Sequence, residues 1–345
     1  MDTRIYKIDK TDIDKDSMKE LGAIIASGGL VAFPTETVYG LGADAYNDDA
    51  VKKIYEAKGR PSDNPLIVHF ADVDSIKDAV VELSEDAKIL FSHFSPGPLT
   101  VILKKSDKLS KTVTAGLDTV AVRIPSNEIA RELIRYAGVP IAAPSANLSG
   151  KPSPTTPKHV IEDMTGRIDA IICGDDCQVG VESTIVDLSG DVPTILRPGG
   201  ITYQDIKKYI PDVRIDKHIL ESVAIDERPR CPGMKYRHYA PEADVTVVEG
   251  KADKVKERID KLLMENNNLK TGVITLEDNE YDADLVINAG KDNKEYAKNL
   301  FRVLREFDEN NIEVVFAEFS KDDEYALTVK NRLYKSAGNK VILVK

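Results

Sequence analysis

Two cations stand close together in segment 58–66, whose sequence is Lys-Gly-Arg-Pro-Ser-Asp-Asn-Pro-Leu. Apolar residues at helical spacing precede Lys58, and Gly59 is a typical residue for the end of a helix. Two prolines stiffen the chain before an apolar strand. Because a lysine point charge and a planar arginine fork can hold different phosphate oxygens, Lys58 and Arg60 predict an anion site, best suited to a nucleoside triphosphate. A solvated basic turn is the alternative.

Two further segments place polar groups on apolar strands. Thr35 lies where an apolar strand ends, within Phe-Pro-Thr-Glu-Thr-Val-Tyr-Gly-Leu-Gly, the usual location of ligand contacts in open α/β sheets. A helix-capping hydroxyl is the alternative for Thr35. Arg123 lies inside the apolar strand 120–124, where burial of its charge requires an internal carboxylate or the carboxylate of a ligand.

Small hydrogen-bonding residues follow another strand, in Ala-Pro-Ser-Ala-Asn around Ser145 and Asn147. Their side chains can donate to phosphate oxygens or bind a hydrated magnesium ion. Ser183 opens one strand and Arg197 ends another, so both can close the same pocket. The sequence has no Gly-x-x-x-x-Gly-Lys-Ser/Thr loop, so any ATP site here differs from the P-loop.

Composition limits the class of protein. The chain has 345 residues, 42% hydrophobic and 30% charged, with a net charge of −11, which argues against broad coating of nucleic acid. It has neither a signal-peptide core nor an apolar stretch of roughly 18 residues, so we expect a cytoplasmic protein without a membrane segment. Three cysteines and five histidines form no metal-binding or hydrolase motif. We expect no metal held by protein side chains.

Alternating strands and helices predict two α/β domains. Residues 1–210 form the first, with a mixed sheet because several connections are short. We expect its strands at 30–33, 66–70, 99–103, 120–124, 140–143, 170–173, 183–188 and 194–197, and its helices up to Lys58 and at 76–81 and 84–94. Residues 243–345 form a small Rossmann-like domain. There we expect strands at 245–248, 272–276, 285–288, 314–319 and 341–344, and helices at 253–264, 295–307 and 327–334.

Residues 211–242 connect the two predicted domains. The stretch 232–241 holds a lysine, an arginine and a histidine, three side chains that can carry positive charge, and two tyrosines, one of them Tyr236, between prolines. A passive tether would favour Gly, Ser or plain charge, so we expect a lid that folds onto a ligand. Packing of the tyrosines between the domains is the alternative.

Five motifs in this order resemble the two-domain form of the threonylcarbamoyl-AMP synthase family, which has a YrdC-type catalytic domain and a smaller C-terminal domain. The motifs are Phe-Pro-Thr-Glu-Thr-Val-Tyr-Gly-Leu-Gly, Lys58-x-Arg60, Val-Arg-Ile-Pro around Arg123, Pro-Ser-Ala-Asn around Ser145, and the linker. One departure concerns the linker, which in the family begins Ser-Pro-Gly-Met and here has Cys231 before the proline. This exchange puts only a hydroxyl hydrogen bond in doubt.

The resemblance implies a YrdC-like twisted mixed sheet and the synthesis of threonylcarbamoyl-AMP and pyrophosphate from L-threonine, bicarbonate or CO2, and ATP with Mg²⁺. The product feeds the tRNA threonylcarbamoyl transferase machinery that makes threonylcarbamoyladenosine (t6A) beside the anticodon, with a weak tRNA contact. Lys58 and Arg60 then resemble the catalytic pair. The implied ATP contacts are Lys58, Arg60, Ser62, Thr119, Ser145, Asn147, Ser153, Arg197 and Tyr236. The implied threonine contacts are Thr35, His69, Arg123, Ala143 and Ser183.

Two other hypotheses remain at this stage. A concave basic surface on a YrdC-like domain could bind double-stranded RNA or tRNA, although the acidic net charge counts against it. A related carbamoyl-adenylate enzyme of hydrogenase maturation usually carries acylphosphatase and zinc-finger segments, which this sequence lacks.

Overall fold

The computed structural model describes residues 2–62, 64–219, 239–276 and 279–345. The chain divides into two compact units. The first includes Met1–Ser149 and Ser153–Ile219, and the second includes Gly150–Pro152 and the described residues from Tyr239 onward. No helix in these ranges combines the length and apolar character that a membrane span requires.

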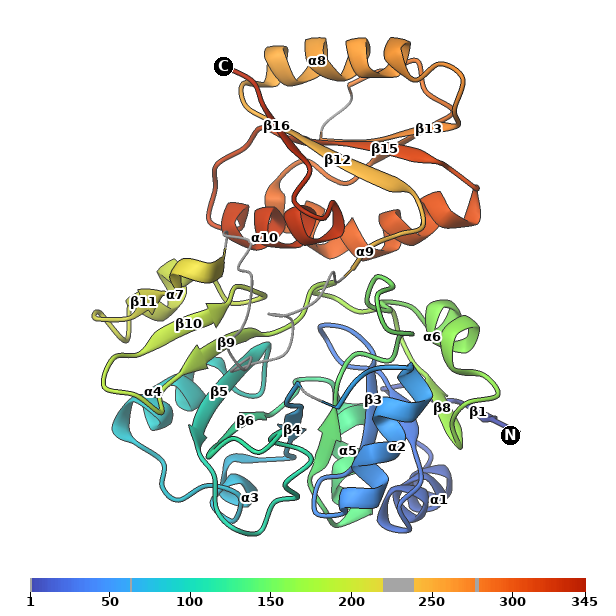
Figure 1. Ribbon diagram of the computed structural model, residues 1–345. Helices are drawn as coiled ribbons and strands as arrows, with labels where there is room; N and C mark the ends of the chain where they lie inside the picture. The colour runs from blue at the N-terminus through green and yellow to red at the C-terminus, as the bar shows by residue number, and fades with distance from the viewer. Residues whose placement is uncertain (1, 63, 220–238, 277–278) are drawn as a thin grey trace. The chain divides into compact units, whose positions relative to one another are not determined.

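The first unit is built on one large mixed sheet (Figure 1). Its strands are β1 (Arg4–Lys7), β2 (Val31–Phe33), β3 (Gly40–Asp44), β4 (Ile67–His69), β5 (Leu99–Lys104), β6 (Thr119–Arg123), β7 (Ile141–Ala143), β8 (Ala170–Cys173), β9 (Thr184–Asp187), β10 (Thr194–Arg197) and β11 (Arg214–Ile215). Their order in the sheet is β1-β8-β2-β3-β7-β4-β6-β5-β9-β10-β11. β4 pairs parallel with β6 and antiparallel with β7, which confirms the predicted mixed sheet.

The helices of this unit begin and end where the sequence supplies capping groups. They are α1 (Lys15–Ala26), α2 (Asp48–Lys58), α3 (Val73–Ile76), α4 (Glu85–Phe94), α5 (Glu128–Ala137), α6 (Pro157–Met164) and α7 (Tyr203–Lys207), with a 3₁₀ turn at Lys217–Ile219. The Asn47 side chain accepts two backbone N–H groups at the start of α2. Gly59 ends α2 in the left-handed region, with φ of 61°, as its sequence position predicts.

The main core of the first unit lies between α1, α5 and the sheet. Met18, Leu21 and Ile25 of α1 and Leu133 of α5 are fully buried together with residues of β2, β7 and β8. Both helices are amphipathic, and burial of these apolar side chains stabilises the layer that holds the strand ends in place.

The second unit has helices on both faces of a parallel sheet (Figure 1). Its elements are β12 (Asp244–Glu249), α8 (Ala252–Glu265), β13 (Thr271–Thr275), β14 (Leu285–Asn288), α9 (Asn293–Glu309), β15 (Val314–Phe319), α10 (Ala326–Ser336) and β16 (Val341–Leu343), and the strand order is β14-β13-β15-β12-β16. α8 covers one face, and α9 and α10 cover the other. The Rossmann-like prediction is therefore confirmed.

Three expectations about the first unit were wrong or incomplete. The predicted helix at 76–81 is wrong, because α3 ends at Ile76 and Val80 instead forms an antiparallel bridge with Lys105. β1 and α1 precede the first predicted strand, α5, α6 and α7 were also missed, and β11 lies inside the predicted linker 211–242. β3 escaped prediction because its two glycines suggest a loop. Gly42 is required there, since a Cβ atom would lie 2.7 Å from Ile141 Cγ2 and 2.9 Å from Phe33 Cε1.

Candidate active site

Lys58 is buried against the loop that follows β7. Its Nζ donates to the backbone oxygen of Asn147 at 2.6 Å and also to the backbone oxygen of Ser145. The Ser145 hydroxyl donates to Asn147 Oδ1 at 2.5 Å. Because Lys58 is only 3% exposed, the solvated-turn alternative is wrong for this residue. The structure thus brings together a cation and two small polar residues that lie almost 90 positions apart.

Arg60 follows the same helix end. Its backbone N–H donates to Tyr55 O of α2 at 2.9 Å, so the two cations of the basic turn leave one helix terminus. Arg60 is half-buried, whereas Ser62 is exposed. Thr119 is half-buried at the start of β6. Of these predicted ATP contacts, Lys58 is therefore the most buried and Ser62 the most accessible.

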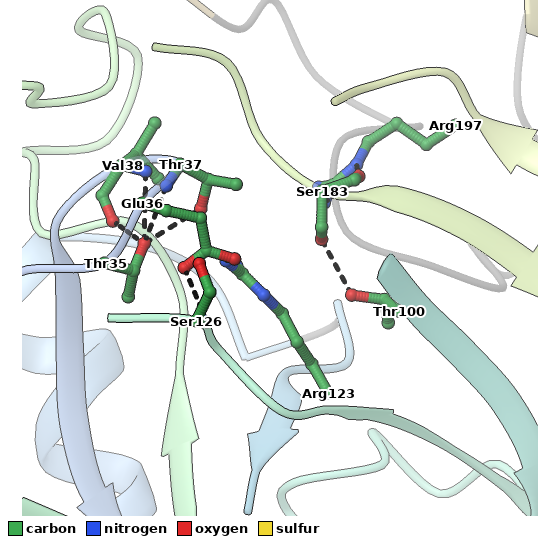
Figure 2. A network of polar contacts seen from close by, with 9 residues as sticks. All are labelled: Thr35, Glu36, Thr37, Val38, Thr100, Arg123, Ser126, Ser183 and Arg197. Atoms are coloured by element: carbon green, nitrogen blue, oxygen red, sulfur yellow. Dashed lines mark hydrogen bonds and ion pairs between the residues drawn. The ribbon is translucent and has the colours of Figure 1, made fainter. Parts of the chain in front are cut away.

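Arg123 meets an internal carboxylate (Figure 2). Its Nη2 donates to Glu36 Oε1 at 2.8 Å, and Glu36 Oε2 accepts the backbone N–H of Ser126 at 3.1 Å. The exposed fractions of the two side chains are 4% for Arg123 and 9% for Glu36. Arg123 Nε is buried and has no hydrogen-bond partner among the described residues. Glu36 therefore neutralises the buried guanidinium but leaves part of its hydrogen-bonding capacity unused.

His69 lies beside Arg123 because β4 and β6 pair in parallel with these two residues in register. The His69 ring meets Phe33 edge to face, with 6.1 Å between centroids. Burial, with a smaller contribution from the charge of Arg123, lowers the pKa of His69 to about 3. His69 Nδ1 is buried without a partner among the described residues. A neutral imidazole and an incompletely paired guanidinium thus stand side by side.

A second polar cluster joins β5, β9 and β10 (Figure 2). The hydroxyl groups of Thr100 and Ser183 lie 2.7 Å apart, and Arg197 donates to Ser183 O through Nε at 3.1 Å and Nη2 at 2.9 Å. Thr100 is the register partner of Arg123, which links this cluster to the preceding one. Ser153, fully buried, donates to Glu182 Oε1 at 2.7 Å.

The turn after β2 connects these groups. The Thr35 hydroxyl donates to Val38 O at 2.5 Å and lies 2.9 Å from the Thr37 hydroxyl. The helix-cap alternative is wrong, because the next element is β3. At the end of the turn, Tyr39 O accepts the N–H of Ala146, which lies between Ser145 and Asn147. One tight turn therefore reaches Arg123 through Glu36 and the Lys58 region through Tyr39.

Two predicted site residues are still to be placed, Ala143 and Tyr236. Ala143 is the last residue of β7, 3% exposed, and pairs with Ile67 of β4. Tyr236 lies outside the described residues, as does most of the predicted lid, including Cys231.

Sequence reasoning gave no role to Glu36, Thr100 or Glu182, which contact predicted site residues. Glu36 stands inside one of the motifs, but its partner Arg123 is 87 positions away. The available signal was the buried arginine itself, which required an internal carboxylate or a ligand.

The fold and the site define a class: an α/β protein with a buried lysine at a helix end, buried arginines at the ends of two strands of a mixed sheet, no P-loop, and a Rossmann-like second unit. Residues 23–199 match the Sua5, YciO and YrdC family model, described as "Telomere recombination", and residues 201–338 match "Threonylcarbamoyl-AMP synthase, C-terminal domain". This chain belongs to the threonylcarbamoyl-AMP synthase family.

Relatives match it over nearly its full length. The threonylcarbamoyl-AMP synthase of Pyrococcus abyssi is 47% identical over 334 residues, which are 96% of this chain and 97% of that protein. The Bacillus subtilis enzyme is 46% identical over 350 residues, covering 99% of this chain and 100% of that protein. The solved structure of P. abyssi Sua5 complexed with L-threonine superposes with a TM-score of 0.95 at 46% identity, covering 99% of this chain and 100% of that one.

Proposed function

We propose that this chain forms threonylcarbamoyl-AMP and pyrophosphate from L-threonine, bicarbonate or CO2, and ATP. The observation that carries the proposal is the pair of buried nitrogen atoms, Arg123 Nε and His69 Nδ1, that lack partners among the described residues. Buried polar atoms usually find hydrogen-bond partners, so two adjacent exceptions favour a ligand with acceptor atoms. The L-threonine bound in the P. abyssi relative supports an amino acid as that ligand.

At the threonine end, we propose that Arg123 binds the carboxylate of the amino acid. A guanidinium recognises a carboxylate strongly through charge-assisted hydrogen bonds. The remaining contacts in this proposal are Thr35, His69, Ala143 and Ser183. The methyl and the hydroxyl of threonine both need contacts, since an apolar pocket alone rejects a missing methyl by only about 1 to 3 kcal/mol.

At the ATP end, we propose that Lys58 and Arg60 neutralise phosphate charge as the catalytic pair. Their exit from one helix end, and the contacts of Lys58 with Ser145 and Asn147, support a shared phosphate site. The further ATP contacts in this proposal are Ser62, Thr119, Ser153, Arg197 and Tyr236. Mg²⁺ enters with the ATP phosphates, and hydroxyl and amide oxygens such as those of Ser145 and Asn147 suit its hydrated form.

The chemistry needs no nucleophile from the protein. The neutral threonine amine adds to CO2, and loss of a proton from nitrogen leaves a carbamate. A carbamate oxygen then attacks the α-phosphorus of ATP, the bond to the β-phosphate oxygen breaks, and pyrophosphate leaves. Positioning and charge neutralisation by Lys58, Arg60 and Arg123 are the contributions of the chain.

The proposal also assigns a role to each part of the chain, and the lid is needed because the product is unstable in water. Residues 1–210, with β11 completing their sheet, carry catalysis; the rest of 211–242 acts as a linker and lid that shields the mixed anhydride, and 243–345 form the C-terminal domain. The product passes in the cytoplasm to the tRNA threonylcarbamoyl transferase machinery, with at most a weak tRNA contact by this chain. A module that only binds double-stranded RNA or tRNA is not favoured by the family relationship.

The test is pyrophosphate release from ATP and bicarbonate with threonine, serine, valine or no amino acid. We expect release to depend on threonine and to fall at least tenfold with serine or valine. Omitting bicarbonate controls for simple ATP hydrolysis. Release that is independent of the amino acid would exclude the proposed reaction.

A further inference from the structure

We infer that Glu36 is a positioning residue, which holds the Arg123 guanidinium so that its unused edge is available to the carboxylate of the amino acid substrate. This inference rests on the proposed function, because it assigns the threonine carboxylate to Arg123. It adds a residue to the site that acts through Arg123 and makes no contact with substrate in this account.

The Glu36 carboxylate is fixed from both of its oxygen atoms. Oε1 accepts from Arg123 Nη2 at 2.8 Å, and Oε2 accepts the backbone N–H of Ser126 at 3.1 Å. Ser126 follows β6, the strand that carries Arg123, by three residues. The carboxylate therefore bridges the end of one strand and the loop after it, which prevents the guanidinium from turning about its long side chain.

The backbone of Glu36 is held as firmly as its side chain. Glu36 O accepts the N–H of Val179 at 2.8 Å, and the neighbouring Thr35 and Thr37 hydroxyls lie 2.9 Å apart (Figure 2). A short turn with this many internal hydrogen bonds has little freedom to move. It fixes the position of the Glu36 carboxylate relative to the sheet.

The unused hydrogen-bond donors of Arg123 are the reason to assign Glu36 a positioning role. A guanidinium has five N–H donors, and Glu36 takes one of them in the described residues. Within the part of the chain that the structure describes, Nε is buried without a partner, and so is Nδ1 of His69, the register partner of Arg123 in the neighbouring strand. A carboxylate that served charge balance alone would satisfy the fork more completely, in the bidentate form that arginine favours.

The alternative is that Glu36 only stabilises the fold, by neutralising a buried cation. The two roles differ in what happens to the folded protein. A purely structural carboxylate changes stability and leaves the threonine affinity of the folded fraction unchanged. A positioning carboxylate changes threonine affinity and leaves the Michaelis constant for ATP unchanged, because its contacts are with Arg123 and Ser126 and not with Lys58.

The test compares Glu36→Gln and Glu36→Asp with the wild-type full-length chain. Glutamine keeps the size and one acceptor oxygen but loses the charge, so we expect KM for threonine to rise about tenfold or more, with a smaller change in kcat and an unchanged KM for ATP. Aspartate keeps the charge on a shorter side chain and should restore part of the affinity. Calorimetric titration with threonine, without turnover, should show the same ranking of affinities. Glu20→Gln is the matched control, because Glu20 is a half-exposed carboxylate that pairs with Arg4.

Two results overturn the inference. One is wild-type KM and affinity for threonine in folded Glu36→Gln, and the other is an equal loss of ATP and threonine affinity. Failure of the proposed function gives a different result. If wild-type protein binds threonine but releases no pyrophosphate, the proposed reaction is wrong. The calorimetric affinities for threonine then still decide the role of Glu36. If Glu36→Gln does not fold, Glu36→Asp decides alone, and unchanged threonine affinity in that variant refutes positioning.

Discussion

Lowering the pH from 7 to 5 should leave the His69 imidazole neutral in the folded protein. Burial and the neighbouring Arg123 charge place its pKa at about 3. At pH 5, about 1% of folded molecules would carry a protonated His69, compared with about 97% for an unperturbed histidine of pKa about 6.5. The surroundings of Arg123, the register partner of His69, therefore gain no positive charge from His69 in this range.

The lowered pKa of His69 also makes the free energy of unfolding depend on pH. The folded pKa of His69 lies below the unfolded value of 6.5, so this residue stabilises the fold fully above pH 6.5. That contribution is lost as the pH falls from 6.5 toward 3, because the unfolded chain then binds a proton that the folded chain does not. Between pH 7 and pH 5 the loss integrates to about 2 kcal/mol in the free energy of unfolding of the first unit.

Proton titration of ¹³C-labelled histidine side chains by NMR measures the pKa directly. The His69 resonance is identified by its absence from the spectrum of His69→Asn, and urea-unfolded protein supplies the reference titration. For stability, urea unfolding of the first unit is compared at pH 7 and pH 5. His69→Asn should lose about 2 kcal/mol less than wild type over this interval. A His69 resonance that titrates near pH 6.5 would refute the reasoning.

Three other outcomes follow from buried groups. Lys58→Met should lower kcat/KM for pyrophosphate release at least a hundredfold in steady-state assays, and circular dichroism should show a folded chain; a near-normal rate would leave the Lys58 contacts with Ser145 and Asn147 as structural only. Burial raises the pKa of the Cys177 thiol well above its usual range, so mass spectrometry should find little iodoacetamide adduct at Cys177 at pH 8 without denaturant, and rapid labelling would contradict this. Glu318→Leu should destabilise the second unit by about 2 to 4 kcal/mol in thermal or urea unfolding, because the buried carboxylate accepts from Thr275, Leu276, Asn279 and Tyr281; an unchanged midpoint would disprove it.

Local patterns predicted much of the fold. The apolar run that becomes β10 and the helix stop at Gly59 were found because each depends on a few neighbouring residues. β1 was not found, since Arg4 and Lys7 give it a charged, exposed character that resembles a loop, and its pairing with β8 decides its conformation. Pairing between distant segments carries no local signature.

In the candidate site, too, some residues could be predicted from local sequence and others only from the pairing of distant segments. Lys58 and Arg60 were predicted as site residues from residue type and spacing, and Arg123 from the physical requirement for a partner. The identity of that partner, Glu36, depends on the order of strands in the sheet, which brings the turn after β2 to the end of β6. The charge balance of the site could therefore be anticipated, but not the residue that provides it.

The pairing of β1 with β8 also affects how the first unit folds during synthesis. Arg4 is hydrogen-bonded in register opposite Ala170, so the first strand has no partner until some 165 further residues have been synthesised. Sheets closed by such distant pairings fold slowly, because a long loop must be ordered before the contact is gained. During synthesis, the nascent first unit therefore passes through a long interval in which apolar strands exist without their neighbours, and aggregation competes with folding.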